Sequence, residues 1–561
     1  MYDIIRLIKK TDANGKAASS MKQFKTTGLC TPEKNYMVDI TDRLKQIREM
    51  VDKGDYFTIN RARQFGKTTT LAALESYLRN DYDVISLDFQ DIGDEVFSNE
   101  FEFVKGFSNM LCDAKDYMGA PLSDKFYDEF KEMGTKTPIG TKLNDLFRLF
   151  FKWCKENEKP IILIIDEVDS ASNNQVFLDF LAGLRSVYLK REKRPDVPAF
   201  HSVILAGVND IKHLKATIRP EEQSKVNSPW NISADFDIDM TLSTAGIKGM
   251  LDEYEADHNT GMNTRQMAER IYEYTHGYPF LVSRICLIID TKLVPDKFAT
   301  LSEAWTDLGF DEAIKILLSE SNMLFESLTG KLTNYPELRE KLRGILLRGD
   351  TLEYLPYDEA QQQLRMYGFI RNEHNTCVVF NKLFEITLYK QFLGKSRYDE
   401  LKQLGTSEKS IFIEDGVLNV PKIMQHFIDS QRFIYDRLKG ETEEEAEKRT
   451  EKFLENEGRE RFLTYLSPII NGVGTYSIEE QTRDHKRMDI VIHYLGKRYI
   501  IEVKIWRGER YNADGEQQLI GYLDRFGLDV GYMLSFNFNK SKKIGVERIS
   551  VGGKTLFEGT M

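Results

Sequence analysis

Cysteine is scarce in this chain of 561 residues, which has five, and no two of them form a Cys-x-x-Cys pair. We therefore expect neither a cysteine-based zinc site nor a disulfide framework, and we expect a reducing cytoplasm. No apolar run approaches the roughly 20 residues that a membrane-spanning helix needs, and the first residues lack a signal-peptide profile. The sequence thus predicts a cytoplasmic protein that does not contact a membrane.

Net positive charge is also lacking, since the formal charge is −11. Residues 481–561 are the exception: 14 Lys+Arg against 10 Asp+Glu give +4, so the other 480 residues carry −15. A basic end on an acidic body suits contact with nucleic acid, although ordinary fluctuation explains so small an excess equally well. The eight histidines show no metal-ligand spacing and are interpreted as structural.

A hydrophobic content of 41% and an aromatic content of 11% are typical of globular proteins, and the length predicts three or four domains. Short apolar stretches alternate with longer amphipathic ones in the first half. This alternation predicts an α/β fold with a parallel sheet covered on both faces. The expected strands are 56–60, 83–89, 160–165, 201–206 and 238–242.

Residues 56–70 carry the most informative pattern, an apolar run ending at Asn60, a loop, and a helical stretch that begins at Lys67. Strand, loop and helix in this order form a phosphate-binding unit, whose lysine reaches the β/γ-phosphates of ATP and whose hydroxyl binds Mg²⁺. Gly66, Lys67 and Thr68 fit these roles, while Arg61 stands where the usual pattern has its first glycine. The expected ATP-binding residues of this loop are Arg61, Arg63, Gln64, Phe65, Gly66, Lys67, Thr68 and Thr69.

A second apolar strand, expected at 160–165, ends in Asp166 and Glu167. Asp166 can hold Mg²⁺, and Glu167 can orient and deprotonate the attacking water. The next strand ends at Asn209, where a polar side chain can sense the γ-phosphate. The alternative for Asn209 is an ordinary turn asparagine before Asp210.

On these motifs, residues 31–290 resemble a bacterial AAA-like ATPase family close to the STAND and archaeal-type NTPases. The resemblance implies that Arg61 is shared with relatives and does not signal a dead site. It also implies that Pro279, in the turn Gly277-Tyr278-Pro279, contacts the nucleotide base or reports its state, and that 36–38 borders the adenine. The arginine finger is left open among Arg185, Arg219 and Arg284, and a finger acting in trans implies a homo-oligomer.

A second candidate site lies in 488–506, which predicts two strands joined by a short turn. Side chains alternate between the faces of a strand, so Glu502 and Lys504 should point the same way, with Asp489 on the partner strand. Two carboxylates bind Mg²⁺, and a lysine beside them can activate water or offset charge at a phosphodiester. The spacing resembles the PD-(D/E)xK nuclease superfamily.

Further residues support this resemblance. Glu460 lies in a preceding helix where many members carry an extra metal-site glutamate, with Glu457 as the alternative. Gln518 begins a Gln-x-x-x-Tyr helix that ends at Tyr522. The proline that often precedes the first aspartate is absent, because Met488 stands there. An ordinary sheet hairpin with these residue types on one face is the alternative interpretation.

The expected domains are a lead-in (1–30), the ATPase domain (31–300), a helical and winged-helix lid (301–395), a linker (396–430) and a nuclease-like domain (431–561). The winged-helix unit is interpreted as a lid rather than a DNA-binding element, because it has no Lys/Arg-rich recognition helix. Residues 431–466 predict one long helix. We expect an ATP-controlled, Mg²⁺-dependent nuclease acting on DNA. The alternative is a regulatory ATPase whose C-terminal domain only binds nucleic acid or protein.

Overall fold

The computed structural model describes residues 21–90, 92–135, 141–171, 174–208, 230–320, 322–348, 352–393, 412–414, 417–436, 455–470, 474–481, 487–506, 509–537 and 543–561. These residues form two compact units. Unit 1 comprises Met1–Asp257, Gly277–Ser283 and Met366–Gly368, and unit 2 comprises His258–His276, Arg284–Arg365 and Phe369–Met561. None of the described helices is both long and apolar enough to cross a membrane.

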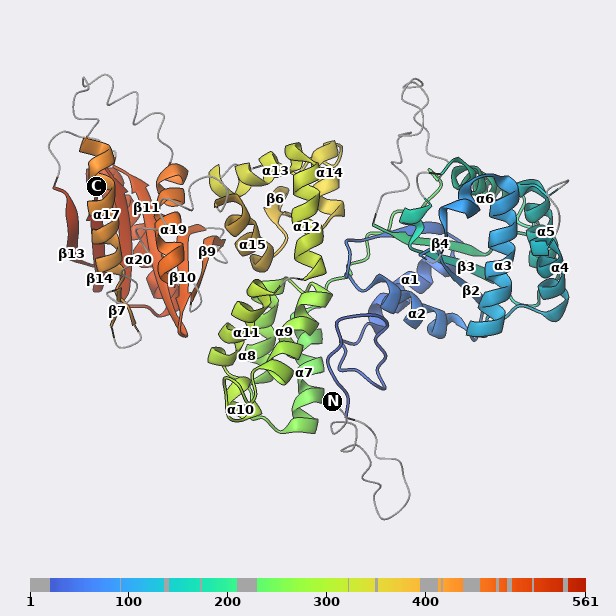
Figure 1. Ribbon diagram of the computed structural model, residues 1–561, viewed down its shortest axis with the longest axis horizontal. Helices are drawn as coiled ribbons and strands as arrows, with labels where there is room; N and C mark the ends of the chain where they lie inside the picture. Colours follow the sequence, from blue (N-terminus) through green and yellow to red (C-terminus); the bar gives the residue numbers. More distant parts are fainter. Residues whose placement is uncertain are drawn as a thin grey trace, which may run out of the picture. The chain divides into compact units, whose positions relative to one another are not determined.

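Unit 1 is built on a parallel four-stranded sheet with the strand order β1-β4-β3-β2 (Figure 1). The strands are β1 (Tyr56–Asn60), β2 (Asp83–Asp88), β3 (Ile161–Asp166) and β4 (Ser202–Gly207). Each lies within one residue of an expected strand. Six consecutive residues of β3 and six of β4 are buried, which requires cover on both faces of the sheet.

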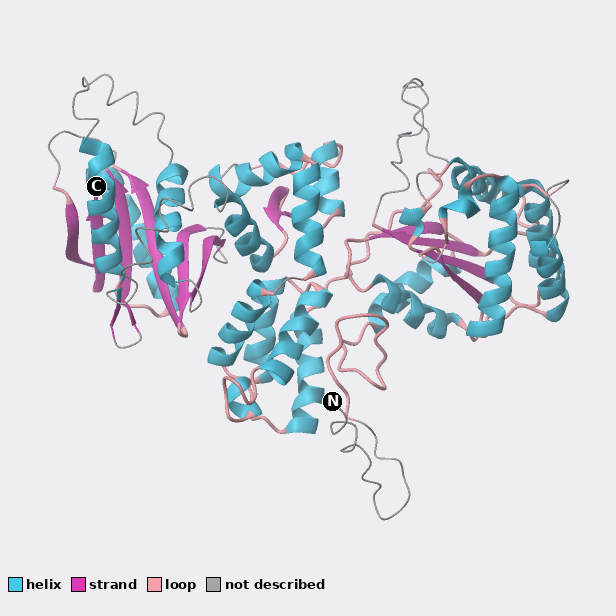
Figure 2. Cartoon of the chain, viewed as in Figure 1, coloured by secondary structure: helices cyan, strands magenta, loops and turns pink. Residues whose placement is uncertain are grey.

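Helices supply that cover, and Figure 2 shows the magenta strands of unit 1 among cyan helices. The helices that lie wholly or mostly in unit 1 are α1 (Thr41–Asp52), α2 (Lys67–Leu78), α3 (Glu100–Met118), α4 (Asp124–Thr135), α5 (Leu143–Glu156), α6 (Gln175–Lys193) and α7 (Thr244–His258), with short 3-10 turns η1 (Asp94–Phe97) and η2 (Val168–Ser170). Helices α3 to α6 share one core with Tyr56 of β1 and with alternate residues of β2, β3 and β4, and this core is rich in phenylalanine. Its two fully buried tryptophans are Trp153 and Trp230.

Two parts of unit 1 differ from the sequence expectations. The end of the expected lead-in is packed: Phe24 is 2% exposed, and its ring lies 5.1 Å from that of Tyr36. The expected strand at 238–242 is wrong, because these residues pair with no strand. The nearby Ala234 forms only an isolated bridge to Phe57 of β1. The carbonyl of Ile238 accepts a hydrogen bond from the Arg61 side chain instead of joining a sheet.

The first part of unit 2 is mainly helical, as expected. Its elements are α8 (Thr264–Thr275), α9 (Pro279–Lys292, whose first turn lies in unit 1), α10 (Leu301–Ala304), α11 (Asp307–Ser319), α12 (Met323–Asn334), α13 (Pro336–Arg343), the π-helical turn η4 (Gly344–Arg348), α14 (Glu359–Met366), the hairpin β5 (Ile370–Glu373) and β6 (Thr376–Val379), and α15 (Lys382–Leu393). The winged-helix prediction rested on a helix, a glycine and a two-strand hairpin in this order, and α14, Gly368 and the β5–β6 hairpin have that order.

The second part of unit 2 is a six-stranded mixed sheet with the order β13-β14-β12-β11-β10-β9. Its elements are the short hairpin β7 (Ile413–Glu414) and β8 (Val417–Leu418), α17 (Val420–Asp436), α19 (Glu455–Ile470), β9 (Gly474–Gln481), β10 (Arg487–Tyr494), β11 (Lys497–Ile505), α20 (Glu509–Phe526), β12 (Val530–Phe536), β13 (Gly545–Val551) and β14 (Lys554–Thr560). Strands β9, β10 and β11 are antiparallel, whereas β12 runs parallel to β11 and to β14.

Helices cover both faces of this sheet. Gly531 in β12 packs against Leu519 and Leu523 of α20 on one face. On the other face Gly559 in β14 packs against Met424 of α17, and Gly458 of α19 packs against Phe536. Because side chains alternate along a strand, Glu502 and Lys504 lie on the α20 face.

The linker expected at 396–430 is corrected, because α17 begins at Val420 and is part of this fold. The backbone amide of Val546 in β13 donates to Gln425 Oε1 of α17 at 3.0 Å, and that of Leu418 donates to the Tyr499 hydroxyl at 3.1 Å. The single helix expected at 431–466 is described as α17 and α19, with 437–454 outside the described residues. Strands β13 and β14 were not predicted.

Candidate functional site

The phosphate loop connects β1 to α2, and its backbone explains why position 61 tolerates arginine. Within the loop, the left-handed backbone conformation occurs at Gln64 (φ 58°) and Gly66 (φ 80°) but not at Arg61. Arg61 therefore does not need the conformational freedom of glycine. Its guanidinium donates to the carbonyls of Asn60 and Ile238, both at 2.8 Å, and so fastens the loop to a distant segment of unit 1.

Lys67 lies under the loop that it follows. Its side chain is 5% exposed, and Nζ donates to the carbonyls of Arg61 at 3.0 Å and Ala62 at 3.3 Å. Burial lowers the pKa of the Lys67 ammonium, and the nearby carboxylate of Glu167 opposes this shift most strongly. The loop thus surrounds a lysine with backbone groups at the N-terminus of α2, the usual position for binding a phosphate.

Thr68 and the acidic end of β3 lie together. Thr68 Oγ1 donates to Asp166 Oδ2 at 2.9 Å, and the backbone amide of Glu167 donates to Asp166 Oδ1, also at 2.9 Å. The buried aliphatic strand β3 positions Asp166 at its carboxyl end, where it is 6% exposed. A hydroxyl and a carboxylate in contact at the start of α2 are suitable ligands for Mg²⁺ beside a nucleotide phosphate.

Glu167 adopts a left-handed backbone (φ 53°), which is uncommon for a residue with a side chain. Burial raises the pKa of its carboxyl, Lys67 opposes this shift, and the like charge of Asp166 adds to it. A carboxylate with a raised pKa is better matched to accept a proton near neutral pH. The geometry is therefore compatible with the role expected for Glu167.

Asp169 is a residue whose part in the site the sequence reasoning missed. Its Oδ2 accepts a hydrogen bond from the backbone amide of Val208 at 2.6 Å, which ties η2 to the end of β4. Asn209, the expected γ-phosphate sensor, follows directly but lies outside the described residues. The spacing of Asp169, three residues after the Mg²⁺ candidate Asp166, was the available signal.

The turn before α9 contacts the phosphate loop within unit 1. The Tyr278 hydroxyl donates to the Arg63 carbonyl, and the Tyr278 ring lies 4.7 Å from that of Phe65 in an edge-on arrangement. A Cβ placed on Gly66 would lie 3.8 Å from the Pro279 ring. Pro279 therefore borders the loop, and Tyr278, to which no role was assigned from the sequence, is the residue hydrogen-bonded to it.

Gly368 is a second contact that the sequence reasoning missed. It has a left-handed backbone (φ +78°), and a Cβ at this position would lie 2.9 Å from the Ala62 side chain. A larger residue would be strained in its backbone and would press on the phosphate loop. The glycine between α14 and the β5–β6 hairpin is thus also a point of close approach to the nucleotide site.

The region expected to border the adenine is largely committed to other contacts. Tyr36 is 3% exposed, packs edge-on against Tyr254 at 5.2 Å, and donates from its hydroxyl to Asp257 Oδ2 at 2.8 Å. Thr69 interacts with the Cys30 thiol, and burial raises the pKa of that thiol. The segment near Cys30 therefore lies over the first turn of α2.

With this geometry in place, a family model described as the AAA-like domain matches residues 33–393, which is 361 of the 561 residues. The chain belongs to the AAA-like domain family. The loop, the acidic strand end and the turn at Pro279 all lie inside the matched range. Residues 394–561 of this AAA-like protein lie outside it.

Solved structures similar to the AAA-like chain share little of its sequence. The Walker-type ATPase of Pyrococcus abyssi is 14% identical with a TM-score of 0.44, covering 65% of this chain and 99% of that one. Cdc6p of Pyrobaculum aerophilum is 12% identical with a TM-score of 0.28, covering 63% and 94%. The RuvB Holliday junction branch migration motor of Thermotoga maritima is 12% identical with a TM-score of 0.29, covering 61% and 92%. No curated protein matches the sequence.

The C-terminal sheet of the AAA-like protein brings two of the expected nuclease residues together. Lys504 Nζ lies 3.0 Å from Glu502 Oε1, and Glu502 is 1% exposed. Asp489 immediately precedes Ile490, whose partner across the ladder is Ile501, so the backbones of Asp489 and Glu502 lie on neighbouring strands. The Asp489 side chain lies outside the described part of the structure.

The other two expected residues lie on the helices. Gln518 is on α20, over the face of Glu502 and Lys504, and its Nε2 donates to the Tyr522 hydroxyl at 2.7 Å. Glu460 is on α19, which packs on the opposite face of the sheet, and its side chain is outside the described part. The helix expected to bring Glu460 to the site therefore lies across the sheet from Glu502.

A buried polar cluster beside Lys504 was not foreseen, because β14 was not predicted. Ser535, the register partner of Lys504, lies within 3.5 Å of Asn512 Oδ1 and of Glu558 Oε1, and Asn512 donates to Glu558 at 2.8 Å. Burial raises the pKa of the Glu558 carboxyl. Among the side chains that the structure describes, no group of three or more His, Cys, Asp or Glu could hold a metal ion.

Proposed function

We propose that this AAA-like protein binds and hydrolyses ATP, and that the nucleotide controls Mg²⁺-dependent cleavage of DNA by its C-terminal sheet domain. The observation that carries the nuclease assignment is the ion pair of 3.0 Å between Lys504 and the buried Glu502. A lysine and a carboxylate held on one face of a strand can position a metal ion and a water molecule at a phosphodiester.

In the nucleotide half, the chain's own groups supply binding and orientation. The loop amides and Lys67 bind the phosphates, while Thr68 and Asp166 hold the metal ion. Glu167 accepts the proton of the attacking water. A Mg²⁺ ion held by Thr68 and Asp166 would neutralise phosphate charge, and the contact between these two side chains supports this assignment.

In the nuclease half, Glu502 provides one carboxylate ligand from the centre of the sheet, and we propose Asp489 as the second, from the neighbouring strand. Lys504 orients the water or stabilises charge on the phosphate. The Mg²⁺ ion supplies charge stabilisation at the scissile phosphate. DNA is the proposed substrate, in keeping with the charge of +4 on residues 481–561.

We propose a homo-oligomer only for the case in which an arginine finger reaches the ATP site of a neighbouring copy of the chain. Of the three arginines considered, Arg284 is bound to Glu320 at 2.5 Å within unit 2, and Arg219 lies outside the described residues. Size measurements with and without ATP would test the assembly directly.

The test is a cleavage assay on circular and linear DNA with Mg²⁺, with and without ATP. Lys504→Ala should abolish cutting and leave ATP turnover intact, whereas Lys67→Ala should remove ATP binding and the ATP dependence of cutting. Lys543→Ala is the matched control, because Lys543 is an exposed lysine of the same domain whose side chain is 82% accessible. Cutting by the Lys504→Ala protein at the level of the control would refute the nuclease assignment.

The alternative function makes a different prediction in the same assay. If the C-terminal domain only binds DNA or a protein, wild-type protein should leave both substrates intact under every condition. DNA retention in a gel-shift experiment, unchanged by Lys504→Ala and without any cutting, would then favour a binding domain.

A further inference from the structure

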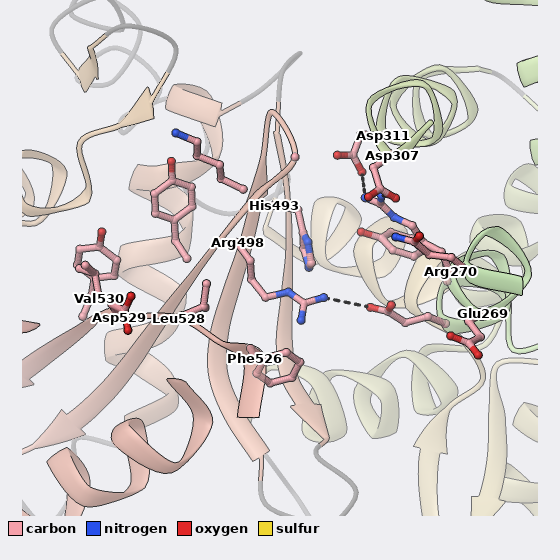
Figure 3. A pocket seen from close by; sticks show the side chains of 17 residues that line it. Glu269, Arg270, Asp307, Asp311, His493, Arg498, Phe526, Leu528, Asp529 and Val530 are labelled. Carbon is pink, nitrogen blue, oxygen red and sulfur yellow. Dashed lines mark hydrogen bonds and ion pairs between the residues drawn. The ribbon is translucent and has the colours of Figure 1, made fainter. Parts of the chain in front are cut away.

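A cavity of about 730 Å³ lies within unit 2, between the helical part and the turn end of the β10–β11 hairpin (Figure 3). Glu269, Arg270 and Glu273 of α8 and Asp311 of α11 line it from the helical side. The sheet side contributes residues of β10, of β11 and of the segment after α20. The cavity is open to solvent, since Glu269 and Asp307 in its lining are exposed, and the charges on its two sides face one another.

Most of the described ionic groups of the cavity form ion pairs within the protein. Arg270 Nη2 lies 2.6 Å from Asp311 Oδ1, and Arg270 also forms an ion pair with Asp307. Arg498 of β11 lies 3.9 Å from Glu273 Oε1, as the dashed line in Figure 3 shows, and its guanidinium lies over the ring of Phe526 at 4.5 Å. Such mutual pairing favours a joint between two parts of the fold over a pocket for a charged ligand.

Lys382 is the deepest cation of this joint. It is 8% exposed, and its Nζ lies 3.1 Å from Glu273 Oε1, 3.3 Å from His493 Nε2 and 4.4 Å from the centre of the Tyr274 ring. Lys382 is the first residue of α15, and it therefore contacts both α8 and β10. A cation at a helix N-terminus opposes the helix dipole, so this position is unfavourable unless carboxylates such as Glu273 compensate.

His493 is the partner of Lys382 on the sheet side. It is 9% exposed, and burial lowers its pKa well below the usual value, with the charges of Lys382 and Arg498 adding to the shift. An ammonium can only donate hydrogen bonds, so the neutral imidazole accepts through Nε2. The contact is therefore directional and depends on a neutral ring.

The joint lies in line with the proposed nuclease site. Arg498, Glu502 and Lys504 are separated by even numbers of residues in β11 and so lie on one face of the sheet. His493 lies four positions after Asp489 along β10, a span of about 13 Å. On the other side, α8 ends at Thr275, three residues before Tyr278, whose hydroxyl is bonded to the phosphate loop.

We propose that Lys382, Glu273 and His493 form the joint through which the helical part holds the β10–β11 hairpin and passes the nucleotide state to the strands that carry Asp489 and Glu502. This regulatory role rests on the proposed nuclease function. The mechanical part of the joint, its hold on the hairpin, can be measured without any DNA cleavage.

The experiment uses the full chain and the variant Lys382→Met, which removes the ammonium and keeps an apolar stem. Lys297→Met is the matched control, because the Lys297 side chain is 55% accessible and forms an ion pair with Glu312 at 3.3 Å in the same unit. Hydrogen–deuterium exchange of peptides that cover β10 and β11 is measured with and without ATP. Cleavage of DNA with and without ATP is measured in parallel.

In Lys382→Met the amides of the β10–β11 hairpin should exchange about tenfold faster than in wild type and in Lys297→Met. A change of about tenfold is the size expected when one contact of a network is broken. Any effect of ATP on that exchange should disappear, and the ratio of cleavage with and without ATP should fall about fivefold or more. ATP turnover should persist. The proposal would be refuted if Lys382→Met and Lys297→Met had the same rates of hairpin exchange and the same ratio of cleavage with and without ATP.

Failure of the joint can be distinguished from misfolding of the variant and from failure of the nuclease proposal. If Lys382→Met does not fold, Glu273→Gln decides, because it removes the carboxylate from a position that is 38% accessible and leaves the shape of the side chain intact. If the wild-type protein cuts no DNA, the nuclease proposal fails, and the exchange data alone decide the joint. Unchanged exchange in Glu273→Gln and Lys382→Met would then refute it.

Discussion

The hydrogen bond from Tyr278 to the Arg63 carbonyl links the turn before α9 to the phosphate loop, and Tyr278→Phe removes that bond while it keeps the ring. Tyr278 is fully buried, and the edge-on contact of its ring with Phe65 does not require the hydroxyl. The substitution therefore tests one polar contact while the packing is kept.

The magnitude follows from the groups involved. A neutral hydrogen bond contributes about 1 kcal/mol net, and a carbonyl left without its buried partner costs about 1–3 kcal/mol. Arg63 is exposed, so water can reach part of the loop and the lower half of that range applies. A loss of about 1–2 kcal/mol from the loop conformation that binds phosphate corresponds to about 5–30-fold weaker ATP binding.

The assay is calorimetric titration with ATP and Mg²⁺, supported by the shift of the melting temperature at a fixed ATP concentration. Tyr127→Phe is the matched control, since its hydroxyl donates to Asp116 at 2.8 Å on the exposed surface of the same unit. The control should bind ATP like wild type. Equal affinities for wild type, Tyr127→Phe and Tyr278→Phe would refute the view that this contact shapes the nucleotide site.

Three further changes test the remaining parts of the two sites. Arg61→Gly, which restores the usual loop pattern, should lower the melting temperature by about 4–8 °C, because it removes the bond to Ile238 at a cost of about 2 kcal/mol; an unchanged melting temperature would contradict this. Glu167→Gln should slow ATP hydrolysis about 100-fold or more while ATP binding is retained. Wild-type turnover should fall as pH decreases through the raised pKa of Glu167, since the proton acceptor must be ionised. Turnover by Glu167→Gln near the wild-type rate would refute this role of Glu167. Burial raises the pKa of Glu558 in the folded state, so the contribution of Glu558 to stability falls as pH rises above the pKa that it has in the unfolded chain. Glu558→Gln should therefore flatten the pH dependence of the melting temperature above that pKa. An unchanged slope in thermal melts would contradict this.

The parts of the fold that depend on local pattern were predictable. The order strand, loop, helix around Lys67 and the apolar strand before Asp166 both follow from neighbouring residues, so their element types and positions were correct within one residue. The contact between Glu502 and Lys504 follows equally from strand alternation.

The parts that depend on distant partners were not. The segment 238–242 has the composition of a strand, but its backbone bonds to Arg61 and to Gly277, far away in the sequence. Likewise Tyr278 reaches a carbonyl more than 200 positions earlier, and no spacing rule indicates that. Such pairings are decided by tertiary structure.

The missed hairpin β13–β14 is a different case, because a local signal was present. Its turn is Gly552-Gly553, with φ of 60° and 80°, and paired glycines favour tight hairpin turns. No residue of β13 is fully buried, so the strand lacks the clear alternation that marks a half-buried strand. The glycine pair of the turn was therefore the better guide to this hairpin than the apolar pattern of its strands.

The four tryptophans of the chain differ in exposure, which gives the protein an intrinsic fluorescent probe next to its C-terminal site. Trp153, Trp230 and Trp305 are at most 2% exposed, whereas Trp506 is half-buried and follows Lys504 by two residues. A water-borne quencher should therefore act mainly on the emission of Trp506. Protection of that emission by DNA would report occupancy next to Lys504 in the unlabelled, unmodified protein, before any bond is cut.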